Sequence, residues 1–456
     1  MISDKSPFSQ SMLDAGNVYI ISNVDAEQIF VWKGKAASVD EKKESMKIAS
    51  DFIKKEGLSR HAKITVMSQF SETALFKMMF DNWVSLNAQQ GLGEVWSINK
   101  IAKVAKVDFD ASTLHTRPDL AAKHQLPDNG SGTVKIWRVE GSDKALVPRS
   151  EYGQFYGGDC YIIFYSYQPR GRQEHIIYYW IGSKATADEV AAVAILTIGT
   201  DEEECGGQAT QVRVTQNKEP PHMMLLFGGK PMIIHAGGTS RIGGQTAAAS
   251  TRLFHVRSGF TERCRAIEVE AVCSSLNSND AFLLVTPNES YAWAGLGASE
   301  TEKRECKELA QTLGAPAPED VDEGSETNAF FDLIGGKMTY CNQPRMENET
   351  VSPRLFECSD ASGNFVIEPV VGEWCQDDLN TDNVMMLDAW SAVYLWIGRE
   401  SSPNEQSRSQ QAAEDYLNSD PSSRDNSTPI YKVQQGSEPM SFKGFFQGWD
   451  HHLWAN

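Results

Sequence analysis

The stretches FVWKGKAASVDE (30–41), YYWIGSKATADE (178–189), YAWAGLGASETE (291–302) and YLWIGRESSPNE (394–405) are four versions of one pattern. In each, an apolar strand runs into a tryptophan, the chain turns, and a helix begins that carries a glutamate nine residues after that tryptophan. The copies are roughly a hundred residues or more apart, which exceeds the about 20–50 residues of a solenoid repeat. A unit of about 100 residues is a small domain. The pattern therefore predicts four small domains built around the same strand–turn–helix corner.

The bulk composition limits the class of protein. A chain of 456 residues is too long for one core, so three or four domains are expected. The net charge of −19 argues against nucleic acid as a partner and suits a protein that binds hard cations. We expect no transmembrane segment and no secretory leader. The eight cysteines show no metal-finger spacing, and we expect most of them to be buried free thiols.

The fold class that we predict is α+β. Each repeat combines short strands with two helices, which fits a short mixed sheet between a long and a short helix. The predicted order is a first repeat at 1–100, a linker at 101–133, a second repeat at 134–235, a linker at 236–251, a third repeat at 252–342, a linker at 343–353 and a fourth repeat at 354–456. The first repeat lacks the opening strand of the others, so we expect it to be incomplete.

A pair of residues with oxygen donors precedes the hairpin of every repeat. The four pairs are Gly16-Asn17, Gly158-Asp159, Asn279-Asp280 and Asp382-Asn383. The first member offers a backbone carbonyl, the second a side-chain oxygen, and the helix glutamate would face them. Ca²⁺ takes about 6–8 such oxygens and tolerates irregular geometry. The second and third repeats keep Asp opposite Glu and are expected to bind best.

The alternative reading of this corner is purely structural. A glutamate in a first helical turn interacts favourably with the helix dipole, and Asp or Asn before a strand is common in turns. Four occurrences at one fixed spacing favour the metal site.

The helix of the second repeat differs from the other three. Its sequence VAAVAILTIGT (190–200) carries no charge, whereas the corresponding helices are amphipathic. A helix that is apolar all round needs a second apolar surface besides its own sheet. That surface is either another domain of the chain or the hydrophobic groove of a partner. The carboxylates of DEEE (201–204) follow directly and would lie at the rim of the contact.

We find no sign of an enzyme. GLGASE (295–300) resembles a dinucleotide-binding loop, but Glu300 stands where the third glycine is needed, and negative charge there would repel a pyrophosphate. No GxxxxGK[ST], HExxH or GxSxG motif occurs. A nucleotide-using enzyme would need a phosphate-binding loop that the sequence does not show.

Long stretches of the chain resemble the gelsolin/villin/adseverin family of calcium-regulated actin-binding proteins. They are YGQFYGGDCYIIFY (152–165), LFGGKPMIIHAGGTSR (226–241), LNSNDAFLL (276–284), SPRLFECS (352–359), DDLNTDNVMMLDAWSAVYLWIG (377–398) and GFFQGWD (444–450). Their order is similar to the last four of the family's six gelsolin-like repeats, so the chain looks like a C-terminal half.

The resemblance implies calcium and actin sites on particular residues. The implied Ca²⁺ ligands are Gly158, Asp159, Glu189 and Thr239; Asn279, Asp280 and Glu302; Asp382, Asn383 and Glu405; and, in the first repeat, Gly16, Asn17 and Glu41. Asp201 would join a further Ca²⁺ site shared with an actin carboxylate. The implied actin contacts are Val193, Ile195, Leu196 and Ile198, on a helix that enters the cleft between actin subdomains.

The function implied by the resemblance is calcium-regulated binding of actin monomers and filament barbed ends. Capping and nucleation follow from that binding, and severing belongs to the full-length family. We expect a cytoplasmic protein of the cytoskeleton in which, without calcium, repeats two and four pack together and cover the apolar helix. Phosphoinositide binding is compatible with the family, but no feature of this sequence supports it. The alternative is a passive calcium-binding interaction module without any effect on actin.

Overall fold

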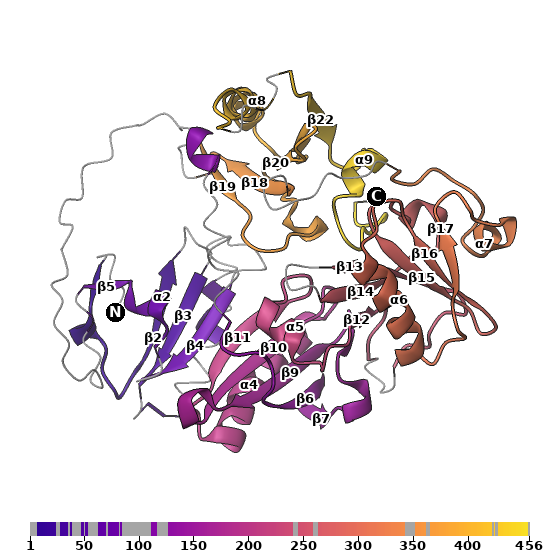
Figure 1. Ribbon diagram of the computed structural model, residues 1–456. Helices are drawn as coiled ribbons and strands as arrows, with labels where there is room; N and C mark the ends of the chain where they lie inside the picture. The colour runs from indigo at the N-terminus through magenta and orange to yellow at the C-terminus, as the bar shows by residue number, and fades with distance from the viewer. Residues whose placement is uncertain are drawn as a thin grey trace. The chain divides into compact units, whose positions relative to one another are not determined.

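A computed structural model gives the structure of the chain (Figure 1). It describes residues 7–23, 28–34, 37–38, 47–49, 51–52, 63–69, 72–81, 83, 111–115, 126–239, 245–258, 263–342, 352–361, 365–421, 424 and 427–454. The chain forms two compact units. The first comprises 1–108, 131–148 and 159–215, and the second comprises 109–130, 149–158 and 216–456.

The first unit is built on one eight-stranded sheet. Its strand order is β2 (Val18–Asn23), β3 (Gln28–Lys33), β4 (Lys63–Ser68), β11 (Thr210–Thr215), β10 (Glu174–Ile181), β9 (Cys160–Tyr167), β6 (Thr133–Glu140) and β7 (Asp143–Leu146). The β9–β10 hairpin turns at η4 (Pro169–Gly171). Helix α4 (Ala187–Cys205) packs against β9 and β10. Short elements complete this unit: β1 (Phe8–Ser9), η1 (Gln10–Met12), α2 (Ala74–Lys77) and β5 (Phe80–Asp81).

The first and second repeats share this sheet. Strand β4 of the first repeat pairs antiparallel with β11 of the second, with Val66 opposite Gln211 and Thr65 opposite Val212. Apolar residues of both repeats, including Val66 and Val193, form one continuous core. Pairing occupies the open edge of the second repeat's sheet, which would otherwise expose unpaired backbone groups.

The second unit contains two sheets. The seven-stranded sheet has the order β17 (Glu319–Asp322), β16 (Ser290–Ala294), β15 (Ala281–Val285), β13 (Arg252–Ser258), β14 (Cys264–Val269), β12 (Met232–His235) and β8 (Gln154–Tyr156). The five-stranded sheet has the order β19 (Val366–Pro369), β18 (Arg354–Ser359), β20 (Val384–Asp388), β21 (Val393–Ile397) and β22 (Ile430–Gln434). The helices of this unit are η2 (Ala111–His115), η3 (Arg149–Glu151), α5 (Pro221–Leu225), η5 (Cys273–Ser275), α6 (Glu300–Thr312), α7 (Asn328–Leu333), η6 (Gln376–Asp378), α8 (Pro403–Asn418) and α9 (Met440–Lys443).

The mixed sheets and flanking helices confirm the α+β class. The sheets do not follow the repeats one to one, because β8 and β12 come from the second repeat yet belong to the sheet of the third. In the first repeat, α2 ends at Lys77 and β5 follows. Among the described residues, none of the helices combines the length and the apolar character needed to cross a membrane.

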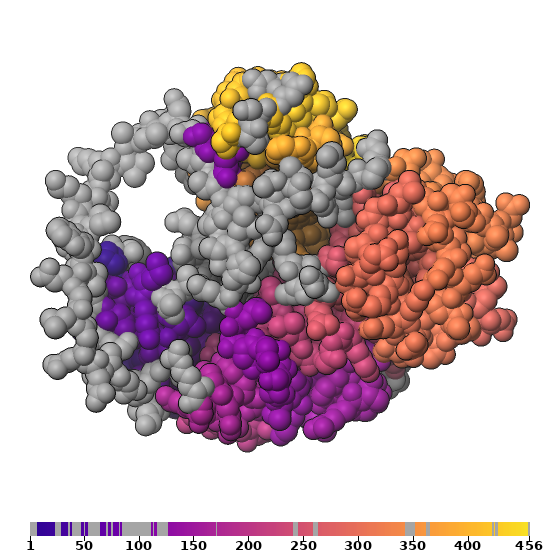
Figure 2. All heavy atoms as spheres, viewed as in Figure 1, coloured from indigo at the N-terminus to yellow at the C-terminus, as the bar shows by residue number. Residues whose placement is uncertain are grey.

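Part of the predicted linker 101–133 is an ordered component of the second unit. Ala111 and Leu114 of η2 are buried in the core of the fourth repeat, and the His115 ring stacks on Tyr416 of α8 with 4.3 Å between ring centroids. In Figure 2 the purple spheres of η2 lie against the yellow spheres of this repeat. His115 Nε2 also lies 3.0 Å from the carbonyl oxygen of Tyr416, 301 residues further along the chain. Part of the predicted linker is therefore anchored on the fourth repeat.

Candidate functional site

The glutamate of the repeated corner has a local structural role in three repeats. Glu189, Glu302 and Glu405 are each the third residue of a helix, where the carboxylate accepts a hydrogen bond from the backbone N–H of the N-cap residue. The N-cap hydroxyl in turn accepts from the glutamate backbone, which makes a capping box. The nine-residue spacing is thus explained partly by helix capping. In the third and fourth repeats the second oxygen of the glutamate, Oε1, also accepts hydrogen bonds from the strand layer.

The third repeat brings its predicted ligands together. Asp280 is fully buried and Glu302 is 4% exposed. Burial, and then the negative charge of Asp280, raise the pKa of Glu302, so the two carboxylates are close enough to repel each other. Glu302 Oε1 accepts from the backbone N–H and hydroxyl of Ser258, at 2.8 and 3.0 Å. Asn279, adjacent to Asp280, is 7% exposed.

Asp280 forms an ion pair with a cationic side chain of the same repeat, Arg257. Arg257 donates from Nε to Oδ1 at 2.9 Å and from its terminal nitrogen to Oδ2 at 2.7 Å. His255 Nε2 lies 2.9 Å from Oδ2. Neither residue was singled out by the sequence analysis, although both stand on strand β13, one and three positions from its end. Alternation along that strand, two residues apart on one face, is the signal that would have found them.

In the second repeat, Asp159 is fully buried and its Oδ2 accepts from the Tyr161 hydroxyl at 3.4 Å. Burial, followed by the charges of Glu189 and Asp159, raises the pKa of the Cys160 thiol, which places both carboxylates around Cys160. Glu189 Oε2 is bound to Thr186.

Gly158 precedes Asp159 and belongs to the second unit. Its N–H donates to the carbonyl of Gly237 at 2.7 Å, two residues before Thr239. A Cβ on Gly158 would lie 2.8 Å from the Gly237 oxygen, so this close approach requires glycine. Thr239 forms an isolated bridge with Gln245.

The fourth repeat contains a carboxylate that the sequence analysis missed. Glu357 of β18 accepts from the side-chain amide of Asn383 and, at 3.0 Å, from that of Asn380. Glu405 is 2% exposed, and its Oε1 accepts from the N–H of Asp360. Burial raises the pKa of Cys358 to about 12, with the charges of Glu357 and Glu405 adding to the effect. Two carboxylates therefore lie near one thiol, although Asn383 stands where the second and third repeats have Asp.

The other predicted residue of the fourth repeat, Asp382, donates its N–H to Asn380 Oδ1 at 3.1 Å. In the first repeat, Gly16 and Asn17 lie in a turn, and both donate to the Asp14 carboxylate. Glu41 lies outside the described residues.

Helix α4 separates its predicted contact residues into two groups. Val193 and Ile198 are 0% and 1% exposed and belong to the core that the helix shares with the sheet. Ile195 is 48% exposed, and Leu196 is partly buried. Val193 and Ile198 therefore support the helix from within, and only Ile195 and Leu196 offer surface to a partner.

Asp201, at the end of this apolar segment, is completely buried. Its Oδ2 lies 2.8 Å from Lys33 Nζ of the first repeat, and the two side chains are 0% and 3% exposed. Oδ1 accepts from the N–H of Ala209 at 2.9 Å, and Oδ2 also accepts from the side-chain amide of Gln211. In this arrangement Asp201 is fully satisfied inside the protein.

The donor set at the corners fits a hard cation that binds oxygen. Carboxylates, amide oxygens and carbonyls meet there, which are the ligands of Ca²⁺. In the part of the chain that the structure describes, no cluster of three or more His, Cys, Asp or Glu side chains could hold a metal ion. A corner site would thus combine two carboxylates with backbone and amide oxygens.

Comparison with known proteins relates all four repeats to one family. The family model described as Gelsolin repeat matches residues 3–77, 141–224, 265–331 and 365–443. Gelsolin of Gallus gallus is 47% identical over 458 residues, covering 100% of this chain and 59% of that protein. A Halocynthia roretzi protein named "Gelsolin, cytoplasmic" is 47% identical over 454 residues, covering 100% and 63%. Gelsolin of Xenopus laevis is 48% identical over 405 residues, covering 88% and 97%. The chain spans about 60% of the length of the first two relatives.

Proposed function

Because the chain belongs to the gelsolin family, we propose that it binds actin under the control of calcium, at monomers and at filament barbed ends. The observation that carries the proposal is the outer face of α4, where Ile195 is 48% exposed beside a helix end rich in carboxylates. An apolar helix face of this kind docks into a hydrophobic groove. Capping and nucleation follow from binding at the barbed end.

Calcium would be held at the corners of the second, third and fourth repeats. In the third repeat the ligands would be Asp280, Glu302 and the carbonyl of Asn279, and the ion would neutralise two buried carboxylates that repel each other. In the fourth repeat Glu357 supplies the charge that Asn383 lacks, so we expect this site to be stronger than its sequence suggests. In the second repeat Asp159 and Glu189 would take the same roles.

The switch would act on Asp201, which we assign to a site shared with an actin carboxylate. Lys33 neutralises Asp201 in the pairing of the first and second repeats. Binding of calcium and actin would have to displace Lys33, because one buried carboxylate oxygen cannot serve both cations. The backbone edge of β11 can likewise pair with only one strand at a time, and β4 occupies it here.

Actin co-sedimentation with calcium and with a chelator tests the proposal. We expect binding with calcium and little without it. Ile195→Asp should weaken binding by about 30-fold or more, as expected for the centre of a contact. Val371→Asp is the control, because Val371 is 78% exposed but lies in the fourth repeat, outside α4 and outside the proposed calcium corners. Equal binding by Ile195→Asp and wild type would refute the docking role of α4. Calcium binding without any actin response would favour the passive module.

We also infer that the chain acts by binding, not as an enzyme, and that it works on the cytoplasmic actin cytoskeleton. Support comes from its family membership and from the relative named "Gelsolin, cytoplasmic". A nucleotide-turnover assay and the cellular distribution of a tagged chain test these two points.

A further inference from the structure

We propose that Asp280 links the third and fourth repeats by binding three side chains that also contact the fourth repeat. We further propose that calcium bound at Asp280 releases the fourth repeat by displacing Arg257. The inference rests on the proposed calcium site of the third repeat. It assigns to Arg257 the role of an internal cation that competes with calcium. The part of the fourth repeat that it holds is the segment Gly444–Gly448, which follows α9 and is called the closing segment below.

Three side chains donate to the Asp280 carboxylate. Arg257 binds both oxygens, at 2.9 and 2.7 Å, and Asn277 Nδ2 donates to Oδ2 at 2.6 Å. His255 Nε2 lies 2.9 Å from Oδ2. His255 Nδ1 accepts from the N–H of Gly448 at 3.2 Å, so Nε2 carries the proton and donates to Asp280.

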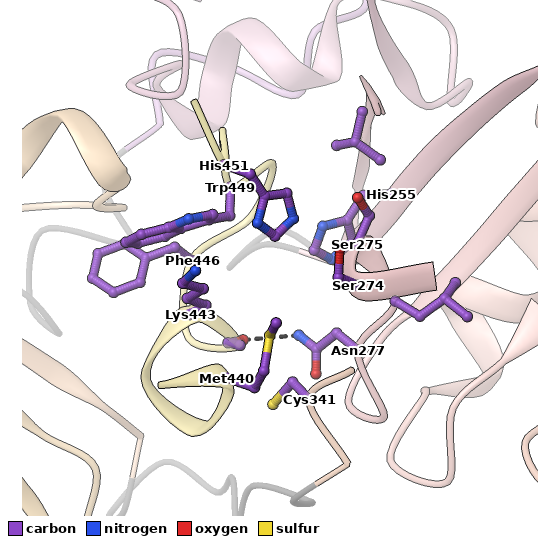
Figure 3. A pocket seen from close by; sticks show the side chains of 13 residues that line it. His255, Ser274, Ser275, Asn277, Cys341, Met440, Lys443, Phe446, Trp449 and His451 are labelled. Carbon is purple, nitrogen blue, oxygen red and sulfur yellow. Dashed lines mark hydrogen bonds between the residues drawn. The ribbon is translucent and has the colours of Figure 1, made fainter. Parts of the chain in front are cut away.

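The same three side chains also bind the closing segment. Arg257 donates to the carbonyls of Phe445 and Gly444, at 3.0 and 3.1 Å. Asn277 donates to the Gly444 carbonyl at 2.8 Å, the bond drawn in Figure 3. His255 completes the set through its bond with Gly448. Each donor to Asp280 thus has a second bond to the fourth repeat, which makes the carboxylate the common anchor of all three.

The closing segment fits closely at this point. A Cβ on Gly444 would lie 2.2 Å from Cys341 Sγ, so only glycine allows its backbone to reach Asn277 and Arg257. Figure 3 shows Asn277 and His255 of the third repeat facing Lys443, Phe446 and Trp449 of the fourth across a small cavity. The contact therefore consists of hydrogen bonds of fixed geometry, which break when Asp280 or its hydrogen-bond donors move.

Calcium and the Arg257 contact exclude each other. An ion at about 2.3–2.6 Å from a carboxylate oxygen takes the position of a hydrogen-bond donor on that oxygen. Arg257 occupies both oxygens of Asp280, and its positive charge would repel the arriving ion. When Arg257 leaves, its bonds to Phe445 and Gly444 are lost as well. Calcium binding in the third repeat is thereby coupled to loss of the contact with the fourth.

The fourth repeat lacks this arrangement. Val256 pairs with Ala281, the residue after Asp280, and Cys358 pairs with Val384, the residue after Asn383. By this register, the positions of His255 and Arg257 are occupied in β18 by Glu357 and Ser359. No cation stands at either position, so the competition belongs to the third repeat.

Isothermal titration with calcium and hydrogen exchange of the closing segment test the inference on the full chain. Coupling is reciprocal, so Arg257→Gln should tighten calcium binding at the third repeat by about 5- to 150-fold. The same variant should exchange the amides of the closing segment faster without calcium. In the wild type, added calcium should produce that faster exchange. Arg257→Lys keeps the charge but loses the bidentate contact. Its calcium affinity and its amide exchange rates should lie between those of the wild type and of Arg257→Gln.

Two variants keep the outcomes distinct. Arg252→Gln is the matched control, because Arg252 stands on the same strand and pairs with Glu268, and it should leave both readouts unchanged. Asp280→Asn should remove one calcium-binding event. If it removes none, the proposed calcium site of the third repeat fails. If it does remove one, but Arg257→Gln binds calcium no more tightly or leaves the exchange of the closing segment unchanged, the coupling through Arg257 is overturned.

Discussion

Replacing Lys33 by Met is expected to loosen the pairing between the first and second repeats. Lys33 Nζ lies 2.8 Å from Asp201 Oδ2 in a site where neither side chain is more than 3% exposed. Removing one partner of a buried ion pair costs about 3–5 kcal/mol, because the remaining charge stays desolvated. Asp201 keeps its hydrogen bonds from Ala209 and Gln211, so we expect a loss of stability of about 3 kcal/mol, at the lower end of this range. A loss of that size shifts the equilibrium between the paired and the open β4–β11 junction by about 100-fold towards the open form.

The loss should appear at the junction of β4 and β11. That junction has two residue pairs, Val66–Gln211 and Thr65–Val212, and a hydrogen bond from the Ser68 hydroxyl to the Gly207 carbonyl at 2.7 Å. Each such bond contributes about 1 kcal/mol, so the buried ion pair is the largest polar contribution. Hydrogen exchange followed by mass spectrometry should show the amides of β4 and β11 exchanging about 100-fold faster in Lys33→Met.

Lys135→Met is the matched control for this prediction. Lys135 forms an ion pair with Glu204 on the same helix as Asp201, at 2.6 Å, but its side chain is 52% exposed. Exposed pairs contribute about 0–1 kcal/mol, so exchange should change by less than about fivefold. If Lys33→Met left β4 and β11 as protected as the wild type does, the reasoning that Lys33 holds the two repeats together would be refuted.

Two further predictions concern the second and fourth repeats. Burial, followed by the charge of Arg252, lowers the pKa of His235 to about 4 from 6.5. The folded state binds the His235 proton less readily than the unfolded state does. The free energy of unfolding is therefore highest above pH 6.5 and falls by about 3 kcal/mol as the pH falls towards 4. His235→Gln should flatten this part of the urea-unfolding profile, and an unchanged slope would contradict the assignment. Glu357→Gln should weaken calcium binding at the fourth repeat by about tenfold or more in isothermal titration. Its exposed cross-strand neighbour Glu368, changed to Gln, should have no effect, and equal losses in both variants would show a general charge effect.

The sequence determined those features that arise from residues close together in the chain. In the third repeat the strand that contains Trp293 is followed by the N-cap Ser299, three residues before Glu302. This pattern folds into the same corner wherever it occurs, because a capping box acts over one helical turn. The hairpin strands, the α+β class and the Asp280–Glu302 pair could be predicted on this basis. The tryptophan of the corner also has a recurring partner, because Glu326 accepts from the indole N–H of Trp293 at 2.9 Å, as Glu438 does from Trp396.

Only the tertiary structure decided how the corners are connected. A helix that is uniformly apolar has no hydrophobic period, so its sequence could not show that Val193 faces the core and Ile195 faces outward. Lys33 meets Asp201 across 168 residues, and Arg257 reaches Gly444 across 187. Such contacts depend on the docking of whole sheets and repeats, which no local pattern encodes. The sequence therefore predicted which residues form the corner of the third repeat, whereas Lys33 and Arg257, the cations bound to Asp201 and Asp280, could be assigned to these carboxylates only from the structure.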